Sequence, residues 1–179
     1  MIILITGTPC VGKSTVGKFL AEKIGAQILD IKKLAKKGGF VETKNNVVFV
    51  DETKINEVVK KEIADGKKYV VPSHLAQYIS PEIVDYCFVL RCNPKILNER
   101  LEKRDYTAEK IQENILCEIL DSCLIESLEL GHRKHLYEID VTSKKPEEVV
   151  NEILKMLKNK FKPFFGDVSW TDTNMLKKF

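Results

Sequence analysis

Residues 7–14 constrain the fold of this chain more than any other part of the sequence. They read GTPCVGKS and match the phosphate-binding loop pattern G-x-x-x-x-G-K-[ST]. The five residues before the loop, IILIT, are apolar and β-branched, which is typical of a buried parallel strand. A helix is predicted after the loop by apolar residues at four-residue spacing and a glycine suited to its end, namely Val16, Leu20, Ile24 and Gly25. Strand, loop and helix therefore follow one another as the motif requires.

The residue types within the loop indicate how it would hold a nucleoside triphosphate. Its glycines let backbone N–H groups approach phosphate oxygens, and the N-terminus of the following helix adds a favourable field. Lys13 is predicted to reach the β- and γ-phosphates, and the Ser14 hydroxyl is predicted to ligate Mg²⁺. Cys10 lies near the helix N-terminus, where a thiolate is favoured. It is either sensitive to oxidation or, as we favour, a small residue tolerated in the loop.

Composition places the chain among globular proteins and excludes several classes. Its 179 residues are 44% hydrophobic and 31% charged, which suits one domain. No apolar run approaches the roughly 18 residues that span a membrane, and the apolar start is interrupted at once, unlike a signal peptide. Five cysteines without a C-x-x-C pair favour a reducing cytoplasm over disulfides or zinc. The net charge of +3 is too weak to imply nucleic acid, so the scattered lysines are interpreted as solvated faces, with RNA contact as the alternative.

Strand-like and helix-like segments alternate along the chain. Strands are predicted over residues 2–6, 26–30, 68–71, 86–91 and 136–141. Helices are predicted over 15–24, 31–37, 53–65, 96–104, 107 to about 131, and from 146 onward. This order predicts an α/β, P-loop NTPase-type three-layer fold in which helices cover both faces of a five-stranded parallel sheet. Ligands are expected at the carboxyl ends of the strands, and the aromatic tail, residues 163–179, is expected to dock on the body, with partner binding as the alternative.

Four further side chains are candidates for contact with a phosphate. Arg104 and Arg100 stand four residues apart on one predicted helix, just before a break that resembles the entry to a small lid over about residues 102–113. The alternative is a surface pair that bonds to neighbouring glutamates. Arg91 closes the fourth strand and is predicted to point toward the ligand. His74 follows the third strand, where it could position water or a phosphate, although a lone histidine is as often structural.

The stretch RLEKRDYTAEKIQENILCEI, together with ITGTPCVGKST and SHLAQYI, resembles the archaeal adenylate kinase family, whose eukaryotic relatives include adenylate kinase isoenzyme six. The resemblance covers nearly the whole chain. A guanine-reading N-K-x-D segment is missing, which argues against a GTPase. The resemblance implies a nucleoside monophosphate kinase that transfers the terminal phosphate of ATP to AMP or a related monophosphate, with Mg²⁺ and an ATPase side activity.

The resemblance also implies roles for particular positions and partners. The phosphate-gripping residues would be Cys10, Gly12, Lys13, Ser14 and Thr15. Arg104 would be the lid arginine, and Lys13, His74 and Arg104 together would be catalytic. The monophosphate would lie against residues 29–52, and the adenine of ATP near residues 142–145. The family is further tied to maturation of the small ribosomal subunit and its 16S rRNA through ribosomal protein uS11.

One position departs from the pattern of the family. Many relatives carry an acidic residue two positions before the histidine, whereas this chain has Pro72 there. Mg²⁺ would then depend on Ser14, substrate phosphates and water, with Asp30, Asp51 or Glu52 as nearby substitutes. Slower catalysis is therefore expected. Two alternatives to a metabolic kinase stay open: a ribosome assembly factor switched by nucleotide, and transfer to another small molecule such as shikimate or a nucleoside.

Overall fold

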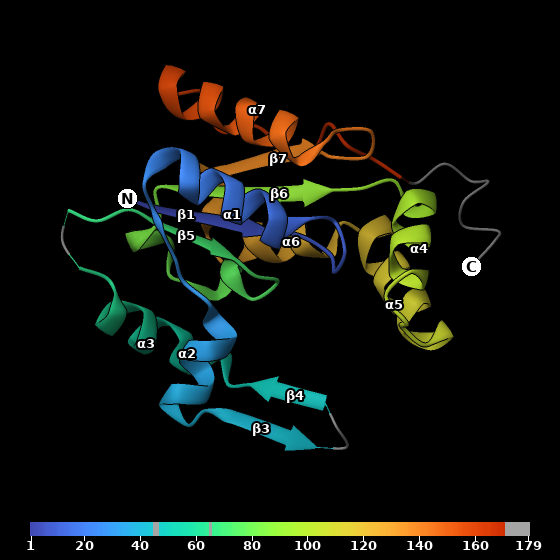
Figure 1. Cartoon of the computed structure of the whole chain (residues 1–179), viewed down its shortest axis with the longest axis horizontal. Helices are drawn as coiled ribbons and strands as arrows, with labels where there is room; N and C mark the ends of the chain where they lie inside the picture. Colours follow the sequence, from blue (N-terminus) through green and yellow to red (C-terminus); the bar gives the residue numbers. More distant parts are fainter. Residues whose placement is uncertain (45–46, 65, 171–179) are drawn as a thin grey trace.

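A five-stranded parallel sheet forms the centre of the computed structural model, which describes residues 1–44, 47–64 and 66–170 (Figure 1). Its strand order is β2-β5-β1-β6-β7. The strands are β1 (Ile2–Thr6), β2 (Gln27–Ile28), β5 (Tyr69–Pro72), β6 (Tyr86–Arg91) and β7 (Leu136–Asp140). Every pairing between them is parallel, which confirms the predicted sheet. The second strand is shorter than predicted because only its exposed edge residues 27 and 28 pair with β5.

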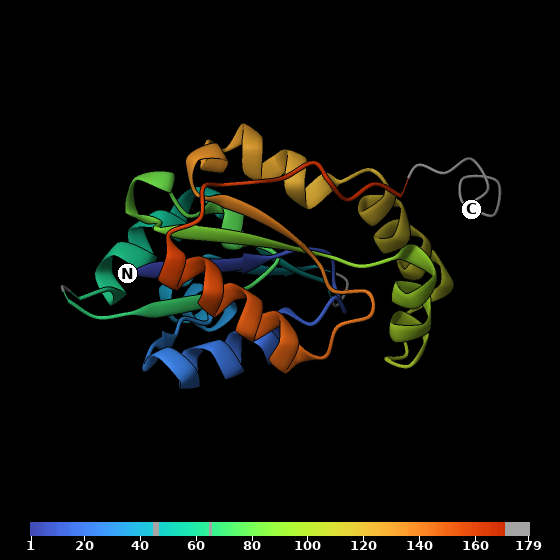
Figure 2. The same cartoon turned by 90° about the horizontal axis from the view of Figure 1, so that it is seen from above.

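Helices cover both faces of this sheet. The helices α1 (Lys13–Ile24) and α7 (Pro146–Asn159) pack together on one face, and Figure 2 shows α6 (Ser122–Glu129) across the sheet from them. Side-chain alternation along β1 explains the two cores. Ile3 and Ile5 pack in the core shared with α1 and α7, whereas Leu4 packs in the other core with Cys87, as expected for a strand buried on both sides.

The long helix predicted from residue 107 to about 131 is wrong. The chain forms α5 (Ala108–Ile119) and α6, separated by a turn in which Asp121 has a left-handed φ of 56°. In a continuous helix the Glu118 carbonyl would accept the bond from the next turn. Here the Arg91 guanidinium donates to that carbonyl at 2.9 Å and also bonds to the Asp121 carboxylate. The hydrogen bonds of the buried Arg91 therefore stabilise the break between α5 and α6.

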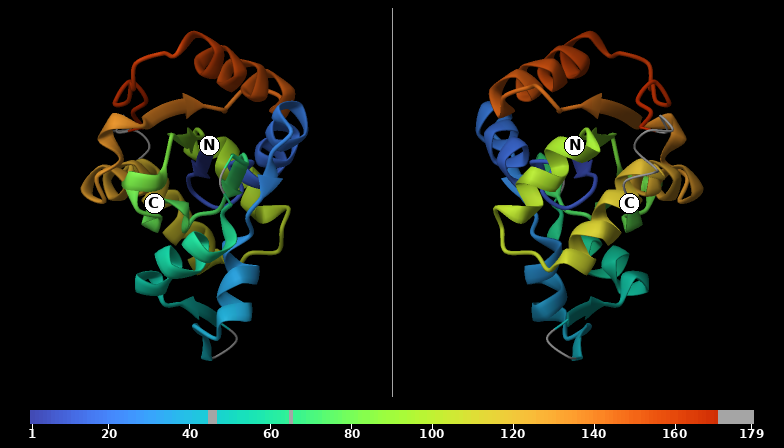
Figure 3. Two further views of the ribbon diagram at one scale, coloured as in Figure 1. Left: turned by 90° about the vertical axis from the view of Figure 1, so that its left-hand side faces the viewer. Right: turned by 90° about the vertical axis from the view of Figure 1, so that its right-hand side faces the viewer.

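An arm projects from the sheet between β2 and β5 (Figure 3). It contains α2 (Ile31–Gly38), the antiparallel hairpin β3 (Val41–Lys44) and β4 (Val47–Val50), a 3-10 turn (Glu52–Lys54) and α3 (Ile55–Glu62). The hairpin was not predicted, because the sequence VETK of β3 has little apolar signal. The helix predicted over 53–65 is shorter in the structure, because its first turn is a 3-10 turn and α3 ends at Glu62.

The remaining elements agree with their sequence signals. The helix α4 (Pro94–Glu102) begins at Asn93, whose side chain accepts a bond from the Lys95 N–H at 3.0 Å. Short 3-10 turns follow β5 and α6: η2 (Ala76–Tyr78), η3 (Pro81–Ile83) and η4 (His132–Lys134). The described part of the tail docks on the body, as predicted, with the ring of Phe164 edge-on to Tyr137 at 5.7 Å. Residues 171–179 lie outside the described part. No helix formed by the described residues is long and apolar enough to cross a membrane.

Candidate functional site

The phosphate-binding loop has a backbone that few residues could adopt. Gly7 has a φ of 132°, and a Cβ placed on it would lie 2.4 Å from the Leu90 carbonyl oxygen, so only glycine fits against β6. Gly12 takes a left-handed conformation as the N-cap of α1, and Cys10 has a φ of 68°. The loop therefore turns back over the end of β1 and opens the N-terminus of α1 to the cleft.

Lys13 lies inside this loop. Its Nζ donates to the carbonyl oxygens of Gly7 at 2.6 Å and of Thr8 at 2.8 Å. Burial lowers the pKa of the Lys13 ammonium to about 8, although nearby acidic groups such as Glu118 oppose the shift. A polyphosphate beside the loop would place negative charge next to the Lys13 ammonium and favour its charged form. This agrees with the predicted role of Lys13 in contacting the β- and γ-phosphates. Ser14 and Thr15 follow at the start of α1 with exposed side chains.

A cleft of about 380 Å³ opens beside the loop at the carboxyl ends of β2 and β5. It is lined by Lys13, Ser14, Lys18, Ile28, Asp30, Lys32, Pro72, Ser73 and His74. Its volume falls within the range of small-molecule sites. Cationic side chains line it from α1 and from α2. The structure thus brings together two of the predicted catalytic residues, Lys13 and His74, on one concave surface.

His74 lines the cleft from the turn after β5. Partial burial, and then the positive charges of Lys13, Lys32 and Lys110, lower the pKa of its imidazole to about 4. Because the residue is still exposed to the open cleft, water screens part of these charges. The direction of the shift keeps His74 neutral near neutral pH, so it can hydrogen bond to a phosphate or a water without adding a charge.

The predicted lid arginine lies apart from the cleft. Arg104 is exposed in the turn between α4 and α5, and it is not one of the residues that line the cleft. Arg100 does not bond to the neighbouring glutamates in the described structure; its Nη2 lies 3.5 Å from the Thr142 carbonyl oxygen. The roles of Arg104 and of a lid over residues 102–113 stay predictions, and they require this turn to move toward the loop.

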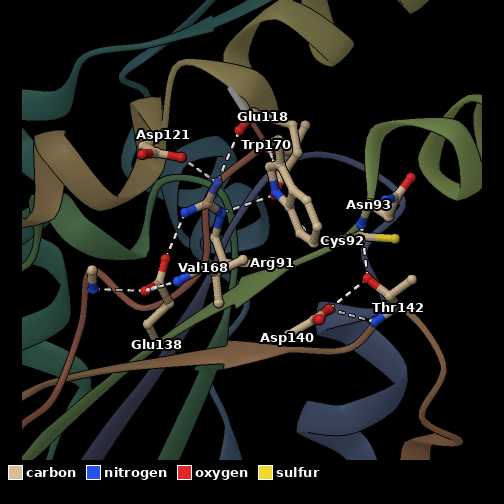
Figure 4. Close-up of polar contacts among 12 residues, drawn as sticks. Arg91, Cys92, Asn93, Glu118, Asp121, Glu138, Asp140, Thr142, Val168 and Trp170 are labelled. Atoms are coloured by element: carbon tan, nitrogen blue, oxygen red, sulfur yellow. Dashed lines mark hydrogen bonds and ion pairs between the residues drawn. The ribbon is translucent and has the colours of Figure 1, made fainter. Parts of the chain in front are cut away.

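The prediction that Arg91 points toward the ligand is wrong. Its side chain is buried, with 1% of the residue exposed. The Nε donates to Glu118 at 2.8 Å, Nη1 donates to Glu138 at 2.6 Å, and Nη2 bonds to Asp121 (Figure 4). Burial opposes the charge, but the attraction of Glu118 and Asp121 outweighs it and raises the pKa of Arg91. The signal that could have revealed this cluster is the pair of glutamates placed within otherwise apolar runs, LYEID and ILCEI.

The side chains near the loop fit a Mg²⁺ ion that is held mainly by substrate. Ser14 and Asp30 both line the cleft, but Asp30 Oδ1 accepts the Lys33 N–H as the N-cap of α2. Among the described residues, no group of three or more histidine, cysteine, aspartate or glutamate side chains could hold a metal. Pro72 lines the cleft and packs against Gly17 of α1. Ser14, phosphate oxygens and waters would therefore supply the coordination, which Mg²⁺ accepts.

The segment predicted to receive adenine, residues 142–145, connects β7 to α7. Thr142 is fixed there: its hydroxyl accepts the Asn93 N–H at 2.8 Å and donates to Asp140 at 2.5 Å. These bonds join the ends of β6 and β7. Thr142 is thus held at the end of the sheet, and contact of residues 142–145 with adenine stays a prediction.

The sheet order, the loop and the position of the cleft define the class of P-loop α/β proteins. Solved structures with the same fold include a shikimate kinase from Acinetobacter baumannii in complex with shikimate, with a TM-score of 0.61 and 17% identity over 89% of this chain and 93% of that one. A gluconokinase from Sinorhizobium meliloti 1021 matches with a TM-score of 0.54 and 19% identity over 88% and 91%. Both likenesses show the fold alone.

Sequence relatives then narrow the class. The profile of the AAA domain family matches residues 3–121. A protein of Thermococcus kodakarensis is 39% identical over 96% of this chain and 94% of its own length, and one of Pyrococcus furiosus is 41% identical over 96% and 92%. A protein of Methanococcus maripaludis is 39% identical over 96% of both chains. All three are named "Putative adenylate kinase", and this chain belongs to their family, as the sequence indicated.

Proposed function

We propose that the protein is a nucleoside monophosphate kinase that transfers the γ-phosphoryl group of ATP to AMP or a related monophosphate. The observation that carries this proposal is the cleft in which Lys13, Ser14 and His74 converge beside the arm. In the reaction, the bond between the γ-phosphorus and its bridging oxygen breaks, and a bond forms to an oxygen of the AMP phosphate. Two molecules of ADP result.

Four residues of the cleft, and Arg104 outside it, would have a part in this reaction. Backbone N–H groups of the loop and Lys13 would hold the β- and γ-phosphates, and Ser14 would bind the Mg²⁺ that neutralises them. Lys32 from the arm offers charge for the acceptor phosphate. His74, neutral, would orient an oxygen of the acceptor or a water. Arg104 would complete the charge around the moving phosphoryl group once its turn closes.

An ATPase side activity is part of the same proposal. Until the exposed turn with Arg104 closes, water can reach a γ-phosphate held by the loop. A coupled assay with Mg-ATP and a panel of monophosphates, beside a control without acceptor, tests both activities. We expect ADP formation that depends on AMP or another monophosphate above a slower basal hydrolysis. The proposal is wrong if no monophosphate accelerates ADP formation.

A role in ribosome assembly, through ribosomal protein uS11, is the second candidate. The docked tail weakens the argument that its aromatic residues bind a partner, because Phe164, Phe165 and Trp170 pack on the body of the protein. What favours a partner is a set of exposed apolar side chains on α5 and the following turn and helix: Leu116, Leu120 and Ile125. Purified uS11 should then bind in a pull-down that depends on ATP. Equal failure with and without ATP would exclude this role.

A further inference from the structure

Glu118 lies at the meeting point of the phosphate-binding loop and the C-terminal segment. It stands in the last turn of α5 and is buried, with 2% of the residue exposed. Its Oε2 accepts the Thr8 hydroxyl at 2.5 Å. Its Oε1 accepts Arg91 Nε at 2.8 Å, the Cys92 N–H at 3.0 Å and the Trp170 indole N–H at 3.2 Å. One carboxylate thus contacts the loop, the end of β6 and the tail.

The tail is held by the same buried cluster. We call residues 164–170 the strap. The strap runs beside β7, where the Glu138 N–H donates to the Phe164 carbonyl at 3.0 Å. The Glu138 carboxylate in turn accepts the Gly166 N–H at 2.7 Å and the Val168 N–H at 3.4 Å (Figure 4). Trp170 ends the strap with its indole turned to Glu118.

Charge explains why the cluster needs the strap. One guanidinium, Arg91, faces three carboxylates, those of Glu118, Asp121 and Glu138. The excess negative charge has to be met by other donors, because an unpaired buried carboxylate is costly. The strap supplies three of these donors, and the Thr8 hydroxyl supplies another. Strap and loop therefore satisfy the same buried charge.

A short chain of contacts leads from the strap to the catalytic lysine. Trp170 bonds to Glu118, and Glu118 bonds to Thr8. The Thr8 carbonyl then accepts Lys13 Nζ at 2.8 Å. Polyphosphate bound to the loop would draw Lys13 away from this carbonyl and change the constraints on Thr8. A change at Trp170 can thus affect Lys13 through these contacts, and a change at Lys13 can affect Trp170.

We propose that Glu118 is a positioning residue that couples docking of the strap to nucleotide binding at the loop. Glu118 does not line the cleft; it fixes Thr8 and, through it, the resting place of Lys13. The inference rests on the proposed function only in that the loop binds a nucleotide. Because coupling is reciprocal, a bound nucleotide changes the environment of the strap, and a loosened strap weakens nucleotide binding by the same factor.

Trp170 is the only tryptophan in the chain and provides the measurement. Mg-ADP is titrated into the full-length protein while tryptophan emission is recorded, and calorimetry measures binding independently. We expect the emission to change and to saturate with the calorimetric Kd. In Thr8→Val, which keeps the side-chain shape but loses the hydroxyl, calorimetry should still detect ADP while the emission change is lost.

Two further variants test reciprocity. Trp170→Phe removes the indole N–H and should raise the Kd for ADP about fivefold or more, the lower range of coupling factors. It should raise the KM for ATP while leaving kcat nearly unchanged, which general destabilisation would not do. Glu126→Gln on α6 is the matched control, because it changes a carboxylate that bonds to Gln77 rather than to the strap. It should bind ADP like the wild type.

The outcomes separate this inference from the proposed function. ADP that binds by calorimetry without any change in emission, and with equal affinity in Trp170→Phe, overturns the coupling and leaves the kinase proposal standing. Coupled binding without any phosphoryl transfer to a monophosphate overturns the kinase proposal and leaves the coupling. Absence of nucleotide binding in the wild type removes both.

Discussion

The two sides of the phosphate-binding loop are built in opposite ways. Behind the loop, Thr8 is buried and bonded to Glu118, and Arg91 is enclosed by carboxylates. In front of it, His74 lines an open cleft, and Arg104 is exposed in the turn between α4 and α5. We call these the anchored side and the open side. On the anchored side the charged groups pair with one another, whereas on the open side the charged side chains line a cleft or are exposed.

This difference suggests that the anchored side serves nucleotide binding, whereas the open side serves catalysis. The loop backbone is held in place by the anchored side, and preorganised donors are what stabilise a transferring phosphoryl group. Under the proposed function, charges on the open side would converge after binding, as in enzymes that close over their substrates. Changes on the anchored side should therefore affect stability and nucleotide affinity. Changes on the open side should affect turnover in a protein that is otherwise intact.

The largest effect is expected for Lys13→Ala, at the boundary between the two sides. Removing the ammonium eliminates the charge closest to the predicted β- and γ-phosphates. We expect kcat/KM for ATP to fall about 1,000-fold, the scale seen when one preorganised donor is lost. Lys23→Ala, an exposed lysine in the last turn of α1, is the control and should leave the rate unchanged. Equal losses in both would contradict the assignment.

Arg91→Met tests whether the anchored side is structural. It leaves the buried Glu118 and Glu138 and the partly exposed Asp121 without their cation, so the free energy of unfolding should fall by about 3–5 kcal/mol. Urea denaturation measures the loss. Lys144→Met, which breaks a pair with Glu152 in which both side chains are 34% exposed, should cost about 0–1 kcal/mol. A cost for Arg91→Met as small as that of the surface pair would refute the anchored side as a structural unit.

Arg104→Ala tests the open side. Because the side chain is exposed, the free energy of unfolding should stay within about 0.5 kcal/mol of the wild type. If the turn closes over the phosphates, kcat should fall about 100-fold, the lower end of the loss seen when one preorganised donor is removed. Steady-state kinetics beside urea denaturation separates the two effects. Lys103→Ala, in the same turn, is the control, and an identical loss of kcat there would point to the turn rather than to the arginine.

His74→Gln should have a smaller effect, about a tenfold loss of kcat, because glutamine keeps hydrogen-bonding capacity. The lowered pKa sets the sign of the pH dependence. The folded protein binds fewer protons than the unfolded chain between about pH 6.5 and pH 4, so His74 makes stability fall as the pH decreases through that window. Denaturation across these pH values should show a weaker fall in His74→Gln. An unchanged slope would contradict the shift.

The sequence was sufficient for the elements whose signals are local. The loop motif, the apolar strands and the helix that follows the loop all appear as predicted, because each depends on neighbouring residues. The strand β3 was missed because VETK carries no periodicity, and its pairing with β4 is a tertiary fact. The break between α5 and α6 was missed for a related reason. It depends on Arg91, which is distant in sequence and buried against the turn.

The candidate site shows the same division. Lys13, Ser14 and His74 were predicted to share a surface from their places at strand ends, and the cleft contains all three. The direction of Arg91 was predicted wrongly, because a position at the carboxyl end of a strand does not fix which side of the sheet a long side chain takes. Only the partners Glu118 and Glu138, from α5 and β7, reveal it. Local sequence patterns therefore predicted where the cleft lies, but not the buried contacts of Arg91 with Glu118 and Glu138 behind it.

Pro72→Asp carries the smallest expected effect and addresses the metal. The substitution restores an acidic side chain at a position that lines the cleft beside Ser14. Because phosphates and waters already satisfy most of the coordination of Mg²⁺, we expect only a three- to tenfold decrease, to order of magnitude, in the Mg²⁺ concentration that gives half-maximal rate. Pro72→Asn is the matched control, since both variants lose the contact with Gly17 and only one gains a charge. If the two variants respond alike to Mg²⁺, the missing carboxylate has no part in the modest catalysis expected of this chain, and the open side would be limited by closure instead.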